Sequence, residues 1–162
     1  MVCSEIVFAR GHPNIKATHR TTVEITMEDY VTPRGDCIIG VSANKSTSSL
    51  NPDFKECLKH EDSILIVVLE VGNLRDFILA QGSPRLILSD PGKIIIRKSE
   101  YIEPATLGVR ANKAAGDLKR ELVESLKNPS TTLRVYLYVF RLDEITSKYT
   151  SSRSVFHDDS TL

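Results

Sequence analysis

The chain has 162 residues, and its 21 basic and 21 acidic side chains give a net charge of zero at pH 7. This balance argues against the broad basic surface of most nucleic-acid-binding domains, although a local basic patch is still open. No apolar run is long enough to cross a bilayer and the first residues lack the basic-then-apolar layout of a signal peptide, so we expect a cytoplasmic protein with no membrane partner.

The first half of the chain predicts four strands and one helix. The strands are expected at residues 5–10, 17–27, 37–41 and 63–71. Polar and apolar residues alternate over 17–27, which places His19 on the apolar face and Glu24 on the polar face. A helix should start at Asn51-Pro52-Asp53, which offers a cap, a proline and an acid, and should end near His60. Residues 63–71 are apolar without alternation, which predicts a central strand buried on both faces.

The second half repeats this arrangement. Strands are expected at residues 76–81, 85–89, 94–96, 106–110 and 132–142. Residues 114–127 carry the strongest helix signal in the chain, because apolar residues recur there at helical spacing and Asn128-Pro129 then ends the helix. Those apolar residues are Ala115, Leu118, Leu122 and Leu126. From residue 143 the chain is polar and rich in Ser and Thr, which predicts a mobile tail over 143–162.

One six-residue segment occurs twice in similar form. Gly40-Val41-Ser42-Ala43-Asn44-Lys45 returns as Gly108-Val109-Arg110-Ala111-Asn112-Lys113, and residues 40–72 align with 108–140 without a gap. We interpret this as an internal duplication within a single domain, 1–142, built from repeats at about 5–72 and 73–142. The predicted fold is α+β, with two pseudo-twofold-related, strand-rich halves that each carry one main helix. They should form a sandwich or a closed or half-closed β-barrel with the helices outside.

The two copies differ most in residues 11–22. This segment contains His12 and His19, whereas its counterpart, residues 82–93, contains no histidine. The first copy also has a small insertion beside Asp36. We therefore predict a small-ligand binding or catalytic pocket in the first repeat, where residues 12–22 meet the turn at 35–37.

Three long motifs resemble a known family. They are G-H-P-N-I-x-A-T-H-x-T-T-x-E-I-T at residues 11–26, R-G-D-C-I-I-G-V-x-A at 34–43 and A-N-K-A-A-x-D-L-x-R-E-L at 111–122. Together they are similar to an archaeal family classed as domain of unknown function 371, over roughly residues 5–142. The resemblance implies an archaeal, intracellular protein. It implies no activity, and the cofactor is unknown.

The predicted pocket has catalytic and ligand-binding candidates. The catalytic candidates are His12, His19 and Asp36, because imidazole and carboxyl groups can exchange protons near neutral pH. The ligand-binding candidates are Asn14, Thr22, Glu24, Lys45 and Lys113. Cys37 is a weaker nucleophile candidate, because it leads directly into an apolar strand. Whether the protein is an enzyme stays open.

A metal-dependent enzyme is one alternative. His12, His19 and a carboxylate from Glu24 or Asp36 would suit zinc or iron. The spacing of the two histidines matches no established ligand motif, and Glu24 is predicted on the opposite strand face from His19, so we assign no metal ligand. The three cysteines are odd in number and far apart, which argues against a zinc knuckle or a disulfide framework and predicts reduced thiols.

Two further alternatives stay open. One is structural: His19 is satisfied inside a sheet and His12 orders a turn. The other is a non-catalytic interaction or RNA-binding module, in which Lys16, Arg20 and Arg34 supply local phosphate contacts. Nearby acids dilute any such patch, so nucleic acid is a disfavoured partner. An unknown small ligand, or a second copy of the chain joined through an exposed edge strand, are the partners we expect.

Overall fold

The long strands of the chain form one antiparallel sheet, sheet A, in the computed structural model, which describes residues 2–146. Its strands are β1 (Cys3–Arg10), β4 (Ser63–Val71), β5 (Leu74–Gln81) and β8 (Thr132–Arg141), in the order β1-β8-β4-β5. The two most apolar stretches, β4 and β8, occupy the centre, as predicted. Most of their outward side chains are only partly buried, so the prediction that β4 is fully buried on both faces was wrong.

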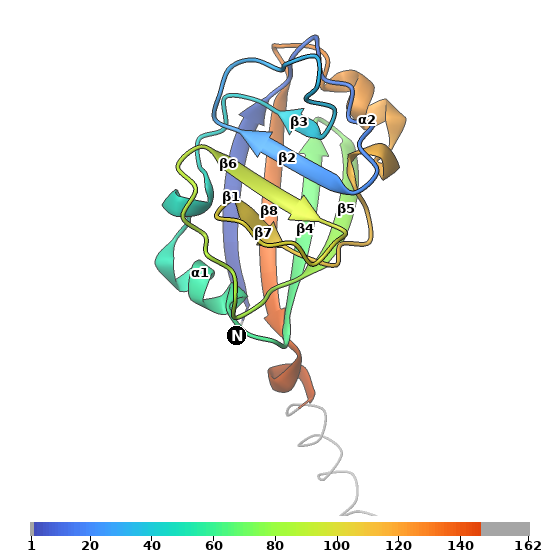
Figure 1. The fold of residues 1–162 in the computed structure, drawn as a ribbon. Helices are drawn as coiled ribbons and strands as arrows, with labels where there is room; N and C mark the ends of the chain where they lie inside the picture. Colours follow the sequence, from blue (N-terminus) through green and yellow to red (C-terminus); the bar gives the residue numbers. More distant parts are fainter. Residues whose placement is uncertain (1, 147–162) are drawn as a thin grey trace, which may run out of the picture.

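The short strands form a second sheet, sheet B, which crosses in front of sheet A (Figure 1). In its centre β2 (Thr22–Thr26) pairs antiparallel with β6 (Lys93–Arg97). At its edges β3 (Ile38–Gly40) pairs parallel with β2, and β7 (Thr106–Gly108) pairs parallel with β6. The counterparts in the two halves are β1 and β5, β2 and β6, β3 and β7, and β4 and β8. Exchanging each strand for its counterpart gives the same strand order in both sheets, read from the opposite edge.

The core lies between the two sheets. In sheet A, buried side chains alternate with more exposed ones along most of each strand, as expected for a sheet with one buried face, whereas the short strands of sheet B are buried almost throughout. The buried core residues from sheet A include Val7, Leu65, Val67, Ile78, Leu133 and Val135, and those from sheet B include Val23, Ile25, Ile94 and Ile96. Burying each such side chain contributes about 1.5–3 kcal/mol, so this layer dominates the stability of the fold.

Two short helices lie at opposite sides of sheet B (Figure 1). They are α1 (Pro52–Leu58) and α2 (Arg120–Ser125), and each follows a 3-10 turn, η1 (Thr47–Ser49) or η2 (Ala115–Asp117). The predicted start of α1 is confirmed, because Asn51 Oδ1 accepts a hydrogen bond from the Asp53 N–H at 2.8 Å. A helix start of this kind satisfies an N–H group that has no partner within the helix.

Three element predictions were wrong for a common physical reason. The helix predicted over 114–127 is divided, because Leu118 is extended with ψ at 151°. The strand predicted over 17–27 begins only at Thr22, and residues 85–89 form no strand. Ala17 (φ 48°) and Leu88 (φ 55°) take the left-handed conformation, which interrupts a strand. The local sequence patterns indicated which residues are buried. They did not indicate the single residues at which the backbone leaves the helical or strand conformation.

The fold is α+β with two sheets and few helices, and over residues 2–146 the sheets do not close into a barrel. Their corners are joined by two isolated bridges, Arg10–Val41 and Gln81–Val109. The expectation of reduced thiols was wrong for Cys3 and Cys57, which form a disulfide with their Cα atoms 6.5 Å apart. No helix in the described part of the chain is long and apolar enough to span a membrane. Residues 142–146 are helical, and the rest of the predicted tail lies outside the described residues.

Candidate functional site

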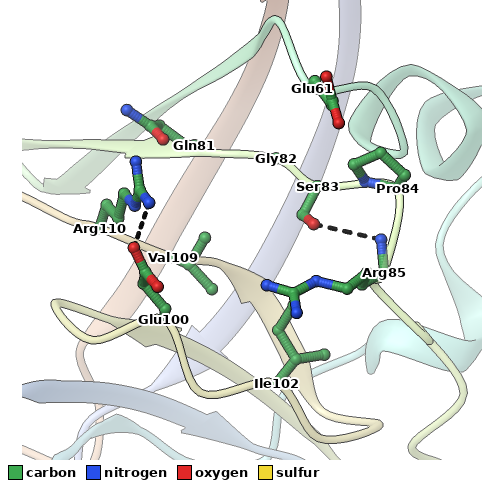
Figure 2. A pocket seen from close by; sticks show the side chains of 10 residues that line it. All are labelled: Glu61, Gln81, Gly82, Ser83, Pro84, Arg85, Glu100, Ile102, Val109 and Arg110. Carbon is green, nitrogen blue, oxygen red and sulfur yellow. Dashed lines mark hydrogen bonds and ion pairs between the residues drawn. The ribbon is translucent and has the colours of Figure 1, made fainter.

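A cavity of about 440 Å³ opens beside the end of β5 in the second half of the chain (Figure 2). The turn after β5, the connection between β6 and β7, and the end of β7 supply most of its wall. Its lining residues are Glu61, Gln81, Gly82, Ser83, Pro84, Arg85, Glu100, Ile102, Val109 and Arg110. The volume falls within the range of about 300–1,000 Å³ that is usual for small-molecule sites.

The turn that carries Arg85 is built by close backbone contact. A Cβ atom on Gly82 would lie 2.2 Å from the Leu58 carbonyl oxygen, so glycine is required where β5 passes the end of α1. The Ser83 N–H then donates to the Leu58 carbonyl oxygen at 2.9 Å. Ser83 Oγ accepts a hydrogen bond from the Arg85 N–H at 3.2 Å, which closes the turn. Figure 2 shows that the Arg85 side chain consequently extends across the cavity toward Ile102.

The charges in the cavity are unevenly paired. The Arg110 guanidinium forms an ion pair with the Glu100 carboxylate, and both side chains are 58% exposed. Neither Arg85 nor Glu61, which also lines the cavity, forms an ion pair with any residue between 2 and 146, so the cavity contains one unpaired charge of each sign. Ile102 and Val109 provide apolar surface beside Arg85. A guanidinium presents paired N–H donors that match a carboxylate or a phosphate, so the cavity is suited to an anion with a small apolar body.

The two segments of the predicted first-half site do meet, through their backbones. The N–H groups of Thr18 and His19 donate to the Asp36 carbonyl oxygen at 2.9 and 3.1 Å. The His19 ring has a local role as well, because its Nδ1 accepts from the N–H groups of Thr21 and Thr22 at 3.2 and 3.1 Å. His19 thus orders the segment that leads into β2, whereas the structural alternative had expected it inside a sheet; it lies outside any strand.

His12 and Asn14 lie against other elements. The His12 N–H donates to the Leu126 carbonyl oxygen at 2.8 Å, and its Nδ1 accepts from the Asn14 N–H at 3.0 Å. The Asn14 side chain reaches the Val31 carbonyl oxygen. His19 instead accepts a hydrogen bond from the Gly116 N–H at 2.8 Å through its carbonyl oxygen. Within residues 2–146, no three His, Cys, Asp or Glu side chains are grouped so that they could hold a metal ion.

Glu24 occupies the centre of the outer face of sheet B. Burial raises the pKa of its carboxyl group; Lys93 partly offsets this shift, and Glu28 and Glu103 add to it. Burial, reinforced by Glu24 and Asp36, also raises the pKa of the neighbouring Cys37 thiol to about 11. Cys37 is therefore a neutral thiol at neutral pH and a poor nucleophile.

The sequence did not indicate that Glu103, a residue of the second half, acts on this carboxyl group, or that Arg97 and Tyr101 lie beside Glu103. The Arg97 guanidinium forms an ion pair with Glu103 at 2.7 Å and lies 4.9 Å from the centre of the Tyr101 ring. Arg97 Nε is buried without a hydrogen-bond partner among the described residues. These residues belong to the second half, which contains no histidine. The sequence comparison of the two halves looked for histidines and therefore did not select them.

Lys45 and Lys113, predicted as ligand-binding residues, are each held by a carboxylate. Lys45 pairs with Glu5, and Lys113 pairs with the buried Asp76 at 2.6 Å. Burial would raise the pKa of the Asp76 carboxyl group, but the hydrogen bonds from Lys113 and from the Lys119 and Phe77 N–H groups outweigh it and lower the pKa. We assign both lysines a structural role and leave them out of the site proposed below.

Comparison with known proteins places the chain among proteins without an assigned activity. Residues 7–140 match the model of DUF371, a domain of unknown function. An uncharacterized protein of the archaeon Methanocaldococcus jannaschii is 50% identical over 122 residues, which cover 75% of this chain and 90% of that protein. The resemblance seen in the three motifs is thereby confirmed: the chain belongs to the DUF371 family of uncharacterised archaeal proteins.

Proposed function

We propose that the protein binds a small anionic ligand in the cavity beside β5. The observation that carries this proposal is the Arg85 guanidinium, which extends into a cavity of about 440 Å³ without a carboxylate partner among residues 2–146. The ligand class is a carboxylate or phosphate attached to a small apolar group. Arg85 binds the anion, and Ile102 and Val109 contact the apolar part.

The proposal moves the site from the first half to the matching place in the second. Gly82-Ser83-Pro84-Arg85 is the counterpart of Gly11-His12-Pro13-Asn14 in the register of the two copies. The first segment was predicted as a site because it contains histidine, a residue that suits catalysis. The second segment is proposed because it contains arginine, a residue that suits anion binding.

Binding can be tested with Arg85→Gln, with Arg20→Gln as a matched control, because both arginines are exposed. Thermal-shift screening of small carboxylates and phosphates should give hits with the wild type and the control. Arg85→Gln should weaken those hits by about tenfold or more, since a charge-assisted hydrogen bond contributes about 1.5–3 kcal/mol. Equal binding by all three proteins would show that the anion is held elsewhere, and the absence of hits across both ligand classes would count against the proposal.

A second candidate is acid–base chemistry at the first-half site, with Glu24 as the proton-exchanging group and with Asp36, His19 and Thr22 proposed as further members of the site. The raised pKa of Glu24 favours this candidate, because perturbed carboxyl groups are enriched at functional sites. Titration of Glu24 by carbon-13 NMR should give a pKa above its usual 4.5. A value at or below 4.5 would remove the candidate.

We also infer that the chain is a single domain, residues 1–142, that arose by duplication of a unit represented by residues 5–72 and 73–142. The repeated six-residue segment and the matching strand orders support this inference. In relatives, Glu5 with Lys45 and Asp76 with Lys113 should then be retained as two equivalent pairs. Family sequences in which only one of the pairs is retained would weaken the inference.

A further inference from the structure

The outer face of sheet A is largely apolar in successive rows, whose polar residues, Ser4 and Gln81, lie on the two edge strands. Strand register places Ile6, Tyr136, Val68 and Phe77 side by side in one row. The next row is Ser4, Tyr138, Ile66 and Leu79. Beyond it, Phe140, Ile64 and Gln81 lie side by side. Phe77 is 50% exposed and Leu79 is 47% exposed, whereas the solvent face of an antiparallel sheet is ordinarily polar.

Both helices pack on the other side of this sheet. Cys57 of α1 is bonded to Cys3, and the Lys119 N–H at the start of α2 donates to Asp76. Cys3 and Asp76 alternate with the outward residues of β1 and β5, so they belong to the inner face. Neither α1 nor α2 therefore covers the outward rows.

A charged row borders the apolar ones. It consists of Phe8, Arg134, Glu70 and Arg75, in strand order. Glu70 accepts hydrogen bonds from Arg134 at 2.9 Å and from Arg75 at 2.7 Å. The face thus has an apolar area with charged residues along one side; protein interfaces commonly combine an apolar core with a polar rim.

We infer that this face binds a second copy of the chain, sheet against sheet, about a twofold axis that runs along the strands midway between β8 and β4. Such an axis places Tyr136 opposite the partner's Val68 and Phe77 opposite the partner's Ile6. Each contact pairs a large side chain with a smaller one. The same axis brings Arg134 to the partner's Glu70, so the charged row is self-complementary as a twofold interface requires.

The dimensions of the face fit a dimer. Four strands spaced about 4.8 Å apart span about 19 Å, and eight residues at about 3.3 Å each span about 26 Å. The face therefore covers roughly 500 Å² per copy, or roughly 1,000 Å² for the pair, which reaches the lower size of a specific interface. The apolar rows within this area are comparable in size to the largest apolar patch of a typical monomer, which is often a binding surface.

The edges of sheet A are less suited to pairing than its face. On β1 the Phe8 N–H donates to Asn44 Oδ1, and the Asn44 N–H donates to the Phe8 carbonyl oxygen. Asn112 makes the same two hydrogen bonds with Leu79 on β5. A capped edge cannot take up another strand at these positions. The homodimer expected from the sequence is therefore placed on the face and not on an edge.

The test is the mass of the full chain in solution, measured by sedimentation equilibrium from low to high micromolar concentration. The wild type should approach twice the monomer mass of 18.1 kDa. Phe77→Lys and Leu79→Lys should each raise the dimer dissociation constant by at least about tenfold, because each places a charge in the apolar area. Both side chains point outward, and far-ultraviolet circular dichroism will check that the variants fold.

Ile87→Lys is the matched control. Ile87 is 48% exposed and lies outside sheet A, so this variant should dimerise like the wild type. A wild type that is monomeric throughout the range overturns the inference and assigns the face to a different partner. A dimer that survives both Phe77→Lys and Leu79→Lys also overturns it, because the copies would then meet elsewhere.

Discussion

Replacing Asp76 by alanine should destabilise the fold more than any exposed charge change. The carboxylate is 1% exposed and accepts three hydrogen bonds, from Lys113 at 2.6 Å, from the Phe77 N–H at 2.7 Å and from the Lys119 N–H at 2.8 Å. Its loss leaves two backbone donors and one ammonium group without an acceptor. At about 1 kcal/mol for each donor, the free energy of unfolding should fall by about 3 kcal/mol. For a domain of this size the Tm should fall by about 6–12 °C.

The pH dependence of Asp76→Asn provides a sharper form of the same prediction. Because the pKa of Asp76 is lowered in the folded state, its stabilising contribution is fully present above the unfolded-state pKa. That contribution is lost as the pH falls from the unfolded-state pKa, about 3.9, through the lower folded-state pKa. The Tm difference between wild type and Asp76→Asn should therefore be constant near neutral pH and shrink in strong acid.

Differential scanning fluorimetry across pH measures both effects. Glu56→Ala, an exposed acid on α1, should change the free energy of unfolding by less than about 0.5 kcal/mol and serves as the control. The reasoning is refuted if Asp76→Ala melts with the control, or if the gap between wild type and Asp76→Asn is the same at pH 3 as at pH 7.

Four further outcomes follow from the structure. Gly82→Ala should fold poorly, while Gly92→Ala, where the nearest atom to an added Cβ is 3.8 Å away, should be tolerated; their melting curves compare them. Cys3→Ser should lower stability by about 2–4 kcal/mol, because the disulfide closes a loop between residues 54 positions apart, and a reductant should lower the Tm of the wild type alone. Alkylation of Cys37 should be slow at pH 8 and accelerate toward pH 11, and a midpoint near 8.5 would contradict its burial. Glu24→Gln should raise the Tm at pH 7 and lose this gain below pH 4, because the raised pKa means that folding disfavours the charged form; an unchanged or lowered Tm at pH 7 would contradict this.

The sequence predicted what depends on neighbours along the chain. The cap at Asn51 and the central positions of β4 and β8 follow from local residue types and from runs of apolar side chains. The apolar stripe over 114–127 also identified buried residues correctly, since Ala115 and Leu122 are 0% exposed. It did not reveal that Leu118 is extended, because a 3-10 turn followed by a short helix buries the same stripe.

The cavity depends on contacts that sequence periodicity does not contain. Gly82 passes the end of α1 at a distance that excludes a Cβ atom, and this contact sets the direction of Arg85. The corresponding first-half glycine, Gly11, passes Asn128 and Leu126 just as closely. Which of the two turns borders a cavity depends on side chains from connections distant in sequence, Glu100 and Ile102 among them.

The two candidate sites share the connection between β6 and β7. Ile102 lines the cavity, and its chain neighbour Glu103 contributes to the raised pKa of Glu24 and pairs with Arg97. An anion that displaces Ile102 would move Glu103 and change the charge around Glu24. The pKa of Glu24 is therefore a test of coupling: it should shift when a ligand fills the cavity of the wild type and stay fixed in Arg85→Gln. If the pKa is raised but insensitive to the ligand, the carboxyl group belongs to a separate site, and the first half has a chemistry of its own.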